Sequence, residues 1–367
     1  MKFKIKDVIS KLEKLAPVEY AEHYDNVGLI TGFYDQEIKN ILVTLDLNEE
    51  VIIESIQKKC NFIITFHPII FNPIKNIVGN TYFKKVLICA LKNDIAIYTI
   101  HTNLDYICNN VSSYVAKILK ISKNKVLIPK KGIMKKLYVY VPVNYAKKVR
   151  NSLFEAGAGN ISNYSHCSYN FDGLGSYMGN EKTNPFIGKK NIFHMEKETC
   201  ISVIFPSYKL EDIKKAIFNN HPYEEISYEI HNIENINPNI GIGIVGFLEK
   251  EMSEYDFLYF LKKKMDLFYI RHSKLRKKSI RKISIITGSG SFGIYPSIME
   301  KSDVFISSDL KYHDFFKSNG NILIIDIGHY ESEKFVKKIL KSFLEKKFHS
   351  IFVYESKINT NPIKYFS

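Results

Sequence analysis

The chain has 367 residues, of which 45% are hydrophobic and 25% charged, and its formal net charge is +14. This length favours two or three domains, and the composition is that of a globular protein. No uncharged apolar run reaches the roughly 18 residues of a membrane span, and the N-terminus MKFKIKDVISKLEKLAP does not resemble a signal peptide. We therefore expect a cytoplasmic protein without a membrane partner.

The patterns of cysteine and lysine residues argue against three further features. The five cysteines form no CxxC pair, which argues against a disulfide framework and against a thiolate zinc site. The lysines are spread along the chain between apolar residues, as on solvated helix faces, so we do not expect a nucleic-acid partner. A basic surface would also suit a phosphorylated small ligand.

Residues 1–130 show alternating helix and strand patterns. Apolar periodicity predicts helices and strands, with a turn-rich loop between the first helix and the first strand. The predicted helices are 5–16, 48–59, 81–92 and 110–120, and the predicted strands are 40–45, 61–66 and 94–100. Because these strands are almost wholly apolar, they favour a parallel or mixed sheet that is covered on both faces.

The pattern changes near residue 130 and returns near residue 241. Residues 131–240 combine predicted strands at 136–142, 198–206 and 224–233 with helices at 143–157 and 210–221, and a segment without helical period at 158–190. Residues 241–367 contain predicted strands at 241–250, 283–287, 303–307 and 321–326, and helices at 253–265, 294–301, 310–318 and 331–347. The predicted fold is a mixed-sheet α/β domain, 1–130 with 241–367, interrupted by an inserted α+β domain, 131–240.

Four residues are candidate ligands of a divalent metal ion. His67 ends one predicted strand, and Asp105 follows the strand that ends on His101. His329 and Glu333 lie four residues apart at the start of a helix, a spacing that directs both side chains to one face. Ligands of open α/β sheets collect beyond the carboxyl ends of the strands, and imidazole with carboxylate suits divalent ions. The alternative is that each side chain is structural, with Glu333 stabilising a helix N-terminus.

Two other features remain open from the residues alone. The glycine-rich segment 288–293, GSGSFG, lacks the lysine and the spacing of a phosphate-binding loop, so we interpret it as a flexible turn. His313 lies in a predicted helix and is either an acid/base group or an ordinary surface residue.

Several segments together resemble one known family, the GTP cyclohydrolase 1 type 2 homologues. They extend over nearly the whole chain and include AEHYDNVGLITG, ILVTLDLNEEVI, ITFHPIIF, IHTNLD, HPYEEISYEI, DLKYHD and DIGHYESE. The resemblance implies that the insertion is similar to the PII signalling proteins, and that the protein forms a ring-shaped homohexamer with two divalent ions per subunit, zinc, iron or manganese. It also implies that His67 and Asp105 bind one ion, that His329 binds the other, and that Glu333 bridges them.

The sequence departs from the family pattern at two places. Phe66 stands where the family often has a first histidine before His67, so the second ion loses a ligand unless water or His101 replaces it. A segment that is similar to TGD in the family is Ser307-Ser308-Asp309 here, which is a milder change.

The resemblance favours a metal-dependent hydrolase that opens the guanine ring of GTP and releases formate. In this hypothesis Glu333 holds the metal, His101 or His313 transfers protons, and Lys311 contacts the triphosphate. The alternative is a non-catalytic metal-binding hexamer with a regulatory or scaffolding role, because a shared fold does not fix a reaction.

Overall fold

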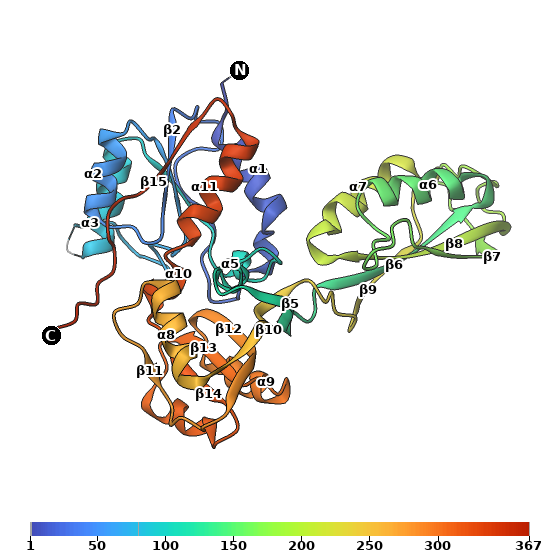
Figure 1. Ribbon diagram of the computed structural model, residues 1–367. Helices are drawn as coiled ribbons and strands as arrows, with labels where there is room; N and C mark the ends of the chain where they lie inside the picture. Colours follow the sequence, from blue (N-terminus) through green and yellow to red (C-terminus); the bar gives the residue numbers. More distant parts are fainter. Residues whose placement is uncertain (1, 80, 367) are drawn as a thin grey trace. The chain divides into compact units, whose positions relative to one another are not determined.

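The computed structural model describes residues 2–79 and 81–366, and these fall into two compact units (Figure 1). Unit 1 combines Met1–Pro129 with Asn239–Ser367, and unit 2 is Lys130–Pro238. Unit 1 is therefore built from both ends of the chain, and each unit has its own hydrophobic core.

The first sheet of unit 1 has five strands in the order β1-β4-β3-β2-β15. The inner strands pair in parallel, and β1 runs antiparallel to β4. The strands are β1 (Gly28–Thr31), β2 (Asn40–Thr44), β3 (Phe62–Thr65), β4 (Ala96–Thr99) and β15 (Phe352–Glu355). Because β2, β3 and β4 are buried on both faces, they are continuous apolar runs without alternation.

Helices cover both faces of this sheet, as Figure 1 shows. Apolar side chains of α2 and α3 pack on one face, against alternate residues of the central strands. Figure 1 places α1 and α11 on the other face. These helices are α1 (Ile5–Leu15), α2 (Glu49–Gln57), α3 (Tyr82–Lys92) and α11 (Val336–Lys347).

The second sheet of unit 1 has six strands in the order β11-β14-β13-β12-β10-β5. Strands β12, β13 and β14 are parallel, and the remaining neighbours are antiparallel. The strands are β5 (Ile121–Pro129), β10 (Gly241–Ser253), β11 (Arg271–His272), β12 (Ser279–Ser289), β13 (Val304–Ser308) and β14 (Leu323–Asp326). One face packs on α5 and α8, the other on α9. These helices are α5 (Val111–Ile118), α8 (Glu254–Met265) and α9 (Ile294–Met299).

Short helices follow several strands of unit 1. They are the α-helices α4 (Thr102–Asp105) and α10 (His329–Glu333), and the 3₁₀ helices η1 (Val18–Tyr20), η3 (Ser291–Gly293) and η4 (Tyr312–Ser318). The predicted helix 310–318 is thus a 3₁₀ helix, and the predicted helix 331–347 is divided into α10 and α11.

Unit 2 is a four-stranded antiparallel sheet in the order β7-β8-β6-β9, with two helices on one face. Its elements are β6 (Met134–Pro142), α6 (Val143–Glu155), β7 (Tyr169–Tyr177), β8 (His194–Pro206), η2 (Ser207–Lys209), α7 (Leu210–Asn220) and β9 (Tyr228–Ile233). The segment 158–190, which has no helical period, contains β7.

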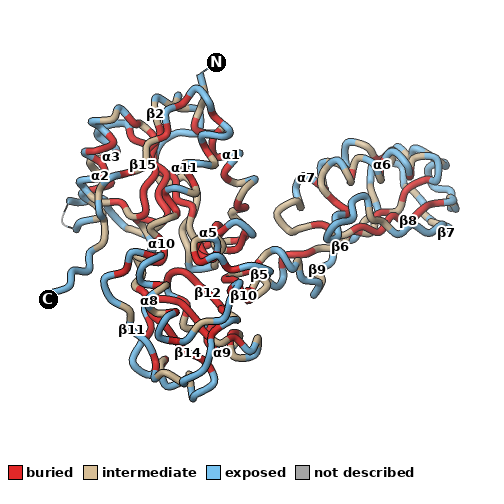
Figure 2. The backbone as a smooth tube through the Cα atoms, in the orientation of Figure 1, coloured by how far each residue is buried: buried red, intermediate tan, exposed pale blue. Residues whose placement is uncertain are grey.

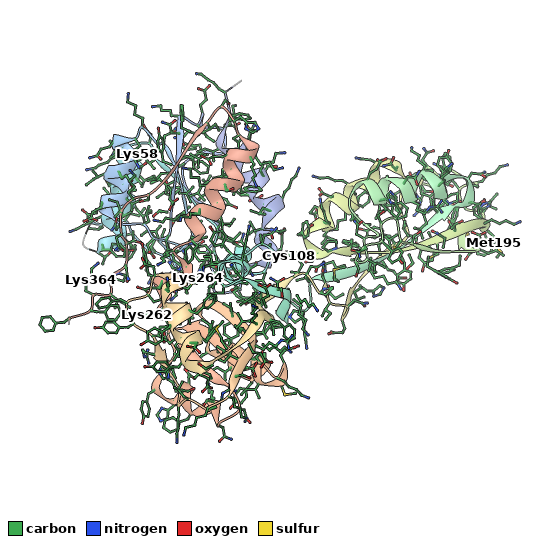
Figure 3. The ribbon with its side chains drawn as sticks, in the orientation of Figure 1. Lys58, Cys108, Met195, Lys262, Lys264 and Lys364 are labelled. Carbon is green, nitrogen blue, oxygen red and sulfur yellow. The ribbon has the colours of Figure 1, made fainter. Side chains whose placement is uncertain are left out.

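Burial follows the sheets in both units, as Figure 2 shows by the red strands and the paler outer helix faces. The lysines lie mainly outside these cores. Lys262 and Lys264, for example, are exposed in the last turn of α8 (Figure 3). Within the described residues, no helix has both the length and the hydrophobicity that crossing a lipid bilayer requires.

A buried ion pair fixes the start of α8 in unit 1. Glu254 accepts hydrogen bonds from Arg276 Nε at 2.9 Å and from the backbone nitrogens of Arg276 and Lys277, at 2.7 and 2.9 Å. The two side chains are only 3% and 5% exposed. Removal of one partner therefore leaves an uncompensated buried charge.

We predict that Glu254→Ala lowers the free energy of unfolding by about 3–5 kcal/mol. The matched control is Glu251→Ala, which removes an exposed pair with Arg281 at 3.7 Å and should cost under about 1 kcal/mol. Urea denaturation followed by circular dichroism measures both. Equal effects of the two substitutions would contradict the role of the buried pair.

Candidate metal centre

Three of the predicted ligands converge at the carboxyl ends of strands from both sheets of unit 1. His67 comes two residues after β3, whereas His329 and Glu333 lie on α10, which follows β14. Glu333 Oε2 is 3.0 Å from His67 Nε2 and 3.0 Å from His329 Nε2. The two imidazole nitrogens are 3.4 Å apart. Residues separated by more than 260 positions thus form one group of donor atoms.

Local backbone geometry brings His329 and Glu333 to this point. Gly328 has a φ of +88°, which allows the chain to turn from β14 into α10. Gly288, at the end of β12, has a φ of +71°, and a Cβ there would lie 2.2 Å from Glu333 Oε1. Glycine at position 288 therefore leaves the space that the Glu333 carboxylate occupies. The segment 288–293, interpreted above as a flexible turn, begins with a residue that shapes the site.

A carboxylate stands behind each imidazole. Asp46 Oδ1 is 2.7 Å from His67 Nδ1, and Asp309 Oδ2 is 2.6 Å from His329 Nδ1. Thr360, in the C-terminal segment, donates a hydrogen bond of 2.6 Å to the other oxygen of Asp46. An acceptor at Nδ1 fixes the proton there and leaves Nε2 with a lone pair, which is the usual arrangement of a metal-binding histidine.

The charges of the group are strongly coupled in the protein without a metal. Burial opposes the charged imidazoles, but the carboxylates of Asp46, Asp309 and Glu333 outweigh it and raise the pKa of His67 to about 9 and that of His329 to about 11. Burial likewise opposes ionisation of Glu333, but the two imidazoles lower its pKa to about 2. The site is thus built to hold positive charge beside the Glu333 carboxylate.

Asp105, the fourth predicted ligand, lies at the end of α4 and lines the same cavity. Its carboxylate is not part of the group of atoms that lie within 4.8 Å of one another. Burial, and then the negative charge of Glu333, raise the pKa of Asp105 well above its usual value. A cation in the cavity would relieve this repulsion between the two carboxylates.

His101 also lines the cavity, and its ring centroid is 5.2 Å from that of His67. Its Nδ1 lies 2.9 Å from Asp25 Oδ1, and Thr102 donates two further hydrogen bonds to the Asp25 carboxylate. Burial raises the pKa of Asp25, but the bonds from His101 and Thr102 outweigh it and leave the pKa below its usual value. His101 is therefore the third histidine here that has an aspartate at Nδ1.

Phe66 and His313, two other residues singled out in the sequence, contribute no donor atom to this group. Phe66 is fully buried, and its ring centroid is 5.2 Å from that of His101. It fills space beside the histidines and offers no donor atom. His313 is exposed on η4, where its ring packs near Tyr312 and Phe316, and it does not line the cavity. The chain does not bring His313 to the other candidates.

The sequence pattern alone does not identify the supporting aspartates. Asp25, Asp46 and Asp309 lie in loops beside β1, β2 and β13, and each contacts a histidine that is distant in sequence. The sequence positions of two aspartates gave a partial indication of this role, because Asp46 and Asp309 lie just beyond apolar strands, as His67 and His101 do.

Comparisons with known proteins identify the family of the chain. The family profile of DUF34/NIF3 (NGG1p interacting factor 3) matches residues 3–362. The chain belongs to this family. It is 34% identical to a protein of Bacillus subtilis, over 98% of this chain and 97% of the relative, and 32% identical to one of Halalkalibacterium halodurans, over 98% of each. Both relatives are named GTP cyclohydrolase 1 type 2 homolog.

A solved structure shows the same fold over the full length. The Bacillus cereus protein related to NIF3 superimposes with a TM-score of 0.84 at 31% identity, covering 99% of each chain. This DUF34/NIF3 chain is therefore a mixed α/β protein of the same architecture.

The pairing of imidazole and carboxylate can be tested in the metal-free protein. We predict that Asp309→Asn lowers the pKa of His329, because the substitution removes the negative charge that stabilises the imidazolium, and that Glu333→Gln lowers the pKa of both His67 and His329. Titration of the histidine ring protons by NMR measures each value. An unchanged His329 pKa in Asp309→Asn would contradict the arrangement.

Proposed function

We propose that the chain binds a divalent metal ion through His67, His329 and Glu333, with Asp105 as the fourth ligand. The observation that supports this most is Glu333 Oε2, a buried carboxylate oxygen on which two imidazole nitrogens converge. It lies 3.0 Å from two imidazole nitrogens. A tetrahedral zinc site with bonds of about 2.0–2.1 Å separates its donor atoms by roughly 3.3 Å, close to the distances here.

We further propose that a second ion binds more weakly than the first. The resemblance implies two ions, but both imidazoles approach the same oxygen of Glu333, as for one ion, and Phe66 offers no ligand. Nitrogen and oxygen donors suit zinc, iron and manganese alike, so the donor set does not choose between these metals.

Elemental analysis of the purified protein tests the centre. We expect about one tightly held ion per wild-type chain, and a second only in excess metal. The double variant His329→Ala/Glu333→Ala should lose both, because two of the four ligands are gone. The matched control is His349→Ala/Glu345→Ala, an exposed pair with the same spacing at the end of α11, which should keep its metal. Equal metal content in all three proteins would refute the site.

The reaction that we propose is hydrolytic opening of the guanine ring of GTP, with release of formate. A cavity of about 1090 Å³ adjoins the donor atoms, and the relatives carry the name of a GTP cyclohydrolase homologue. A bound divalent ion supplies Lewis acidity and lowers the pKa of a water molecule towards neutrality. His101, oriented by Asp25 at Nδ1, is placed to accept or donate a proton at Nε2.

A formate-release assay with GTP distinguishes an enzyme from a binding protein. Metal-loaded wild type should release formate, and His101→Ala should reduce the rate by about 10²–10⁴-fold, the usual contribution of a general acid or base. It should do so without loss of metal, because His101 is not one of the four ligands. A fully loaded protein that releases no formate would favour the alternative, a non-catalytic metal-binding protein with a regulatory or scaffolding role.

We also propose that the chain assembles as a homohexamer in the cytoplasm and that unit 2 is similar to the PII proteins. These proposals rest on the sequence resemblance described above. Sedimentation velocity tests the assembly, and a monomer at micromolar concentration would contradict it.

A further inference from the structure

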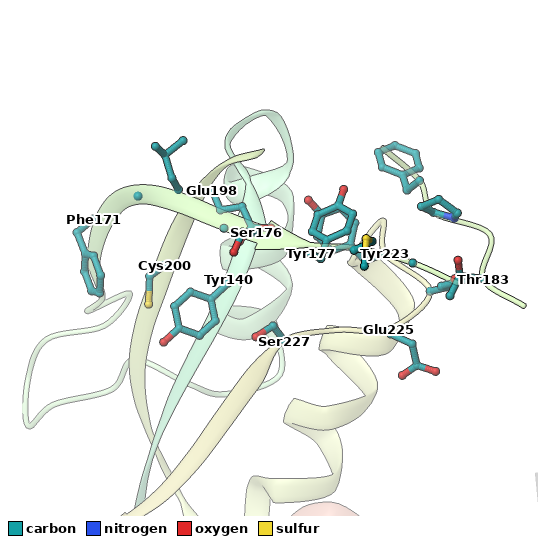
Figure 4. Close-up of a pocket in the computed structure, with 18 residues that line it drawn as sticks. Tyr140, Phe171, Ser176, Tyr177, Thr183, Glu198, Cys200, Tyr223, Glu225 and Ser227 are labelled. Carbon is teal, nitrogen blue, oxygen red and sulfur yellow. The ribbon is translucent and has the colours of Figure 1, made fainter. Parts of the chain in front are cut away.

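Unit 2 contains a cavity of about 500 Å³, remote in sequence from the metal ligands (Figure 4). It lies on the sheet face opposite the helices. Val139 and Ile201 pack into the core beneath α6 and α7, whereas the alternate residues Tyr140 and Cys200 line the cavity. Its volume is in the range of about 300–1,000 Å³ that is typical of small-molecule pockets.

A buried carboxylate lies in the wall of this cavity. Glu198, on β8, is 8% exposed, the hydroxyl of Tyr223 faces its carboxylate, and no lysine, arginine or histidine pairs with it within the described part of unit 2. A Cβ at Gly175, on the neighbouring strand β7, would lie 2.2 Å from Glu198 Oε2. The absence of a side chain at position 175 is therefore what allows the carboxylate to lie against β7.

All charged side chains that line the cavity are acidic. Glu198, Glu224 and Glu225 contribute carboxylates, and no lysine, arginine or histidine lines the cavity. This is unexpected in a chain with a formal net charge of +14, in which a nearby lysine would be the ordinary partner of a buried carboxylate. A buried carboxylate without a cationic partner costs free energy that a bound cation would recover.

Aromatic rings form the rest of the site. The ring centroids of Tyr177 and Tyr223 are 6.0 Å apart, and those of Tyr223 and Phe186 are 6.5 Å apart. Figure 4 shows the rings of Tyr177 and Tyr223 next to each other in the middle of the lining residues. The hydroxyl of Tyr223 is buried, and burial together with the neighbouring Glu198 carboxylate raises the pKa of Tyr223. Aromatic faces attract ammonium groups, and more strongly where water is excluded.

We propose that this cavity binds a small organic cation, namely a primary or quaternary ammonium group on an aromatic or apolar body. The ammonium group lies against Glu198, and the body lies among Tyr177, Phe186 and Tyr223. The Tyr223 hydroxyl, beside Glu198, is available to a polar group of the ligand. This site does not depend on the proposed metal chemistry.

Two probes that differ in one group test the role of charge. Tyramine carries an ammonium group at neutral pH, and tyrosol carries a hydroxyl in its place. Binding to the full-length protein is measured by calorimetry and by saturation-transfer NMR. We expect tyramine to bind at least tenfold more tightly than tyrosol, and the metal-site variant His329→Ala/Glu333→Ala to bind both as wild type does.

Three variants locate the binding. Glu198→Gln removes the charge with little change in shape and should abolish the preference for tyramine. Gly175→Ala keeps the charge but displaces the carboxylate, so it should also weaken tyramine binding. Asn170→Ala is the control on the same strand, because its side chain is exposed and does not line the cavity. It should bind as wild type does, and circular dichroism checks that all three variants are folded.

Three results would overturn the proposal. They are no tyramine binding by the wild-type protein, an unchanged preference in Glu198→Gln, and equal effects of Gly175→Ala and Asn170→Ala. If the Glu198 and Gly175 variants instead change the sedimentation coefficient and wild type does not bind tyramine, the cavity is a contact between copies of this chain and not a ligand site.

Discussion

One buried oxygen atom, Glu333 Oε2, is the constraint on which the arrangement of unit 1 depends. It lies 3.0 Å from imidazole nitrogens of His67 and His329, which come from opposite ends of the chain. The carboxyl ends of two separate sheets must meet for these three side chains to approach one another. The continuity of unit 1 across the insertion is thus a requirement of the site, and folding of either end alone would leave the donor set incomplete.

The surrounding residues hold this arrangement in place. The crowding of carboxylates has a free-energy cost that a bound cation would offset. Asp46 and Asp309 orient the two imidazoles, and Gly288 leaves room for the carboxylate of Glu333. Asp105 adds a further carboxylate whose ionised form is disfavoured by burial and by Glu333. Such a concentration of acids behind and beside histidines is typical of a site whose net charge is completed by a metal ion.

The sequence predicted those parts of this arrangement that depend on local pattern. The apolar strands that precede His67 and His101 were expected at 61–66 and 94–100 and are found at 62–65 and 96–99. The four-residue spacing of His329 and Glu333 correctly placed both on one side of α10. Pairing over long distances was not predictable, so the contacts of Asp25, Asp46 and Asp309 with histidines were missed. Strand β7 was missed because its nine residues are mostly exposed and lack a clear apolar alternation.

Crystals of the protein grown with manganese or zinc give the most direct test of the central claim. Diffraction data collected on either side of the absorption edge of the metal locate the ion by its anomalous signal. The account predicts a peak within about 2.0–2.2 Å of Glu333 Oε2 and of the Nε2 atoms of His67 and His329. A loaded crystal without anomalous density between these three side chains, or with its metal bound elsewhere on the chain, would contradict it.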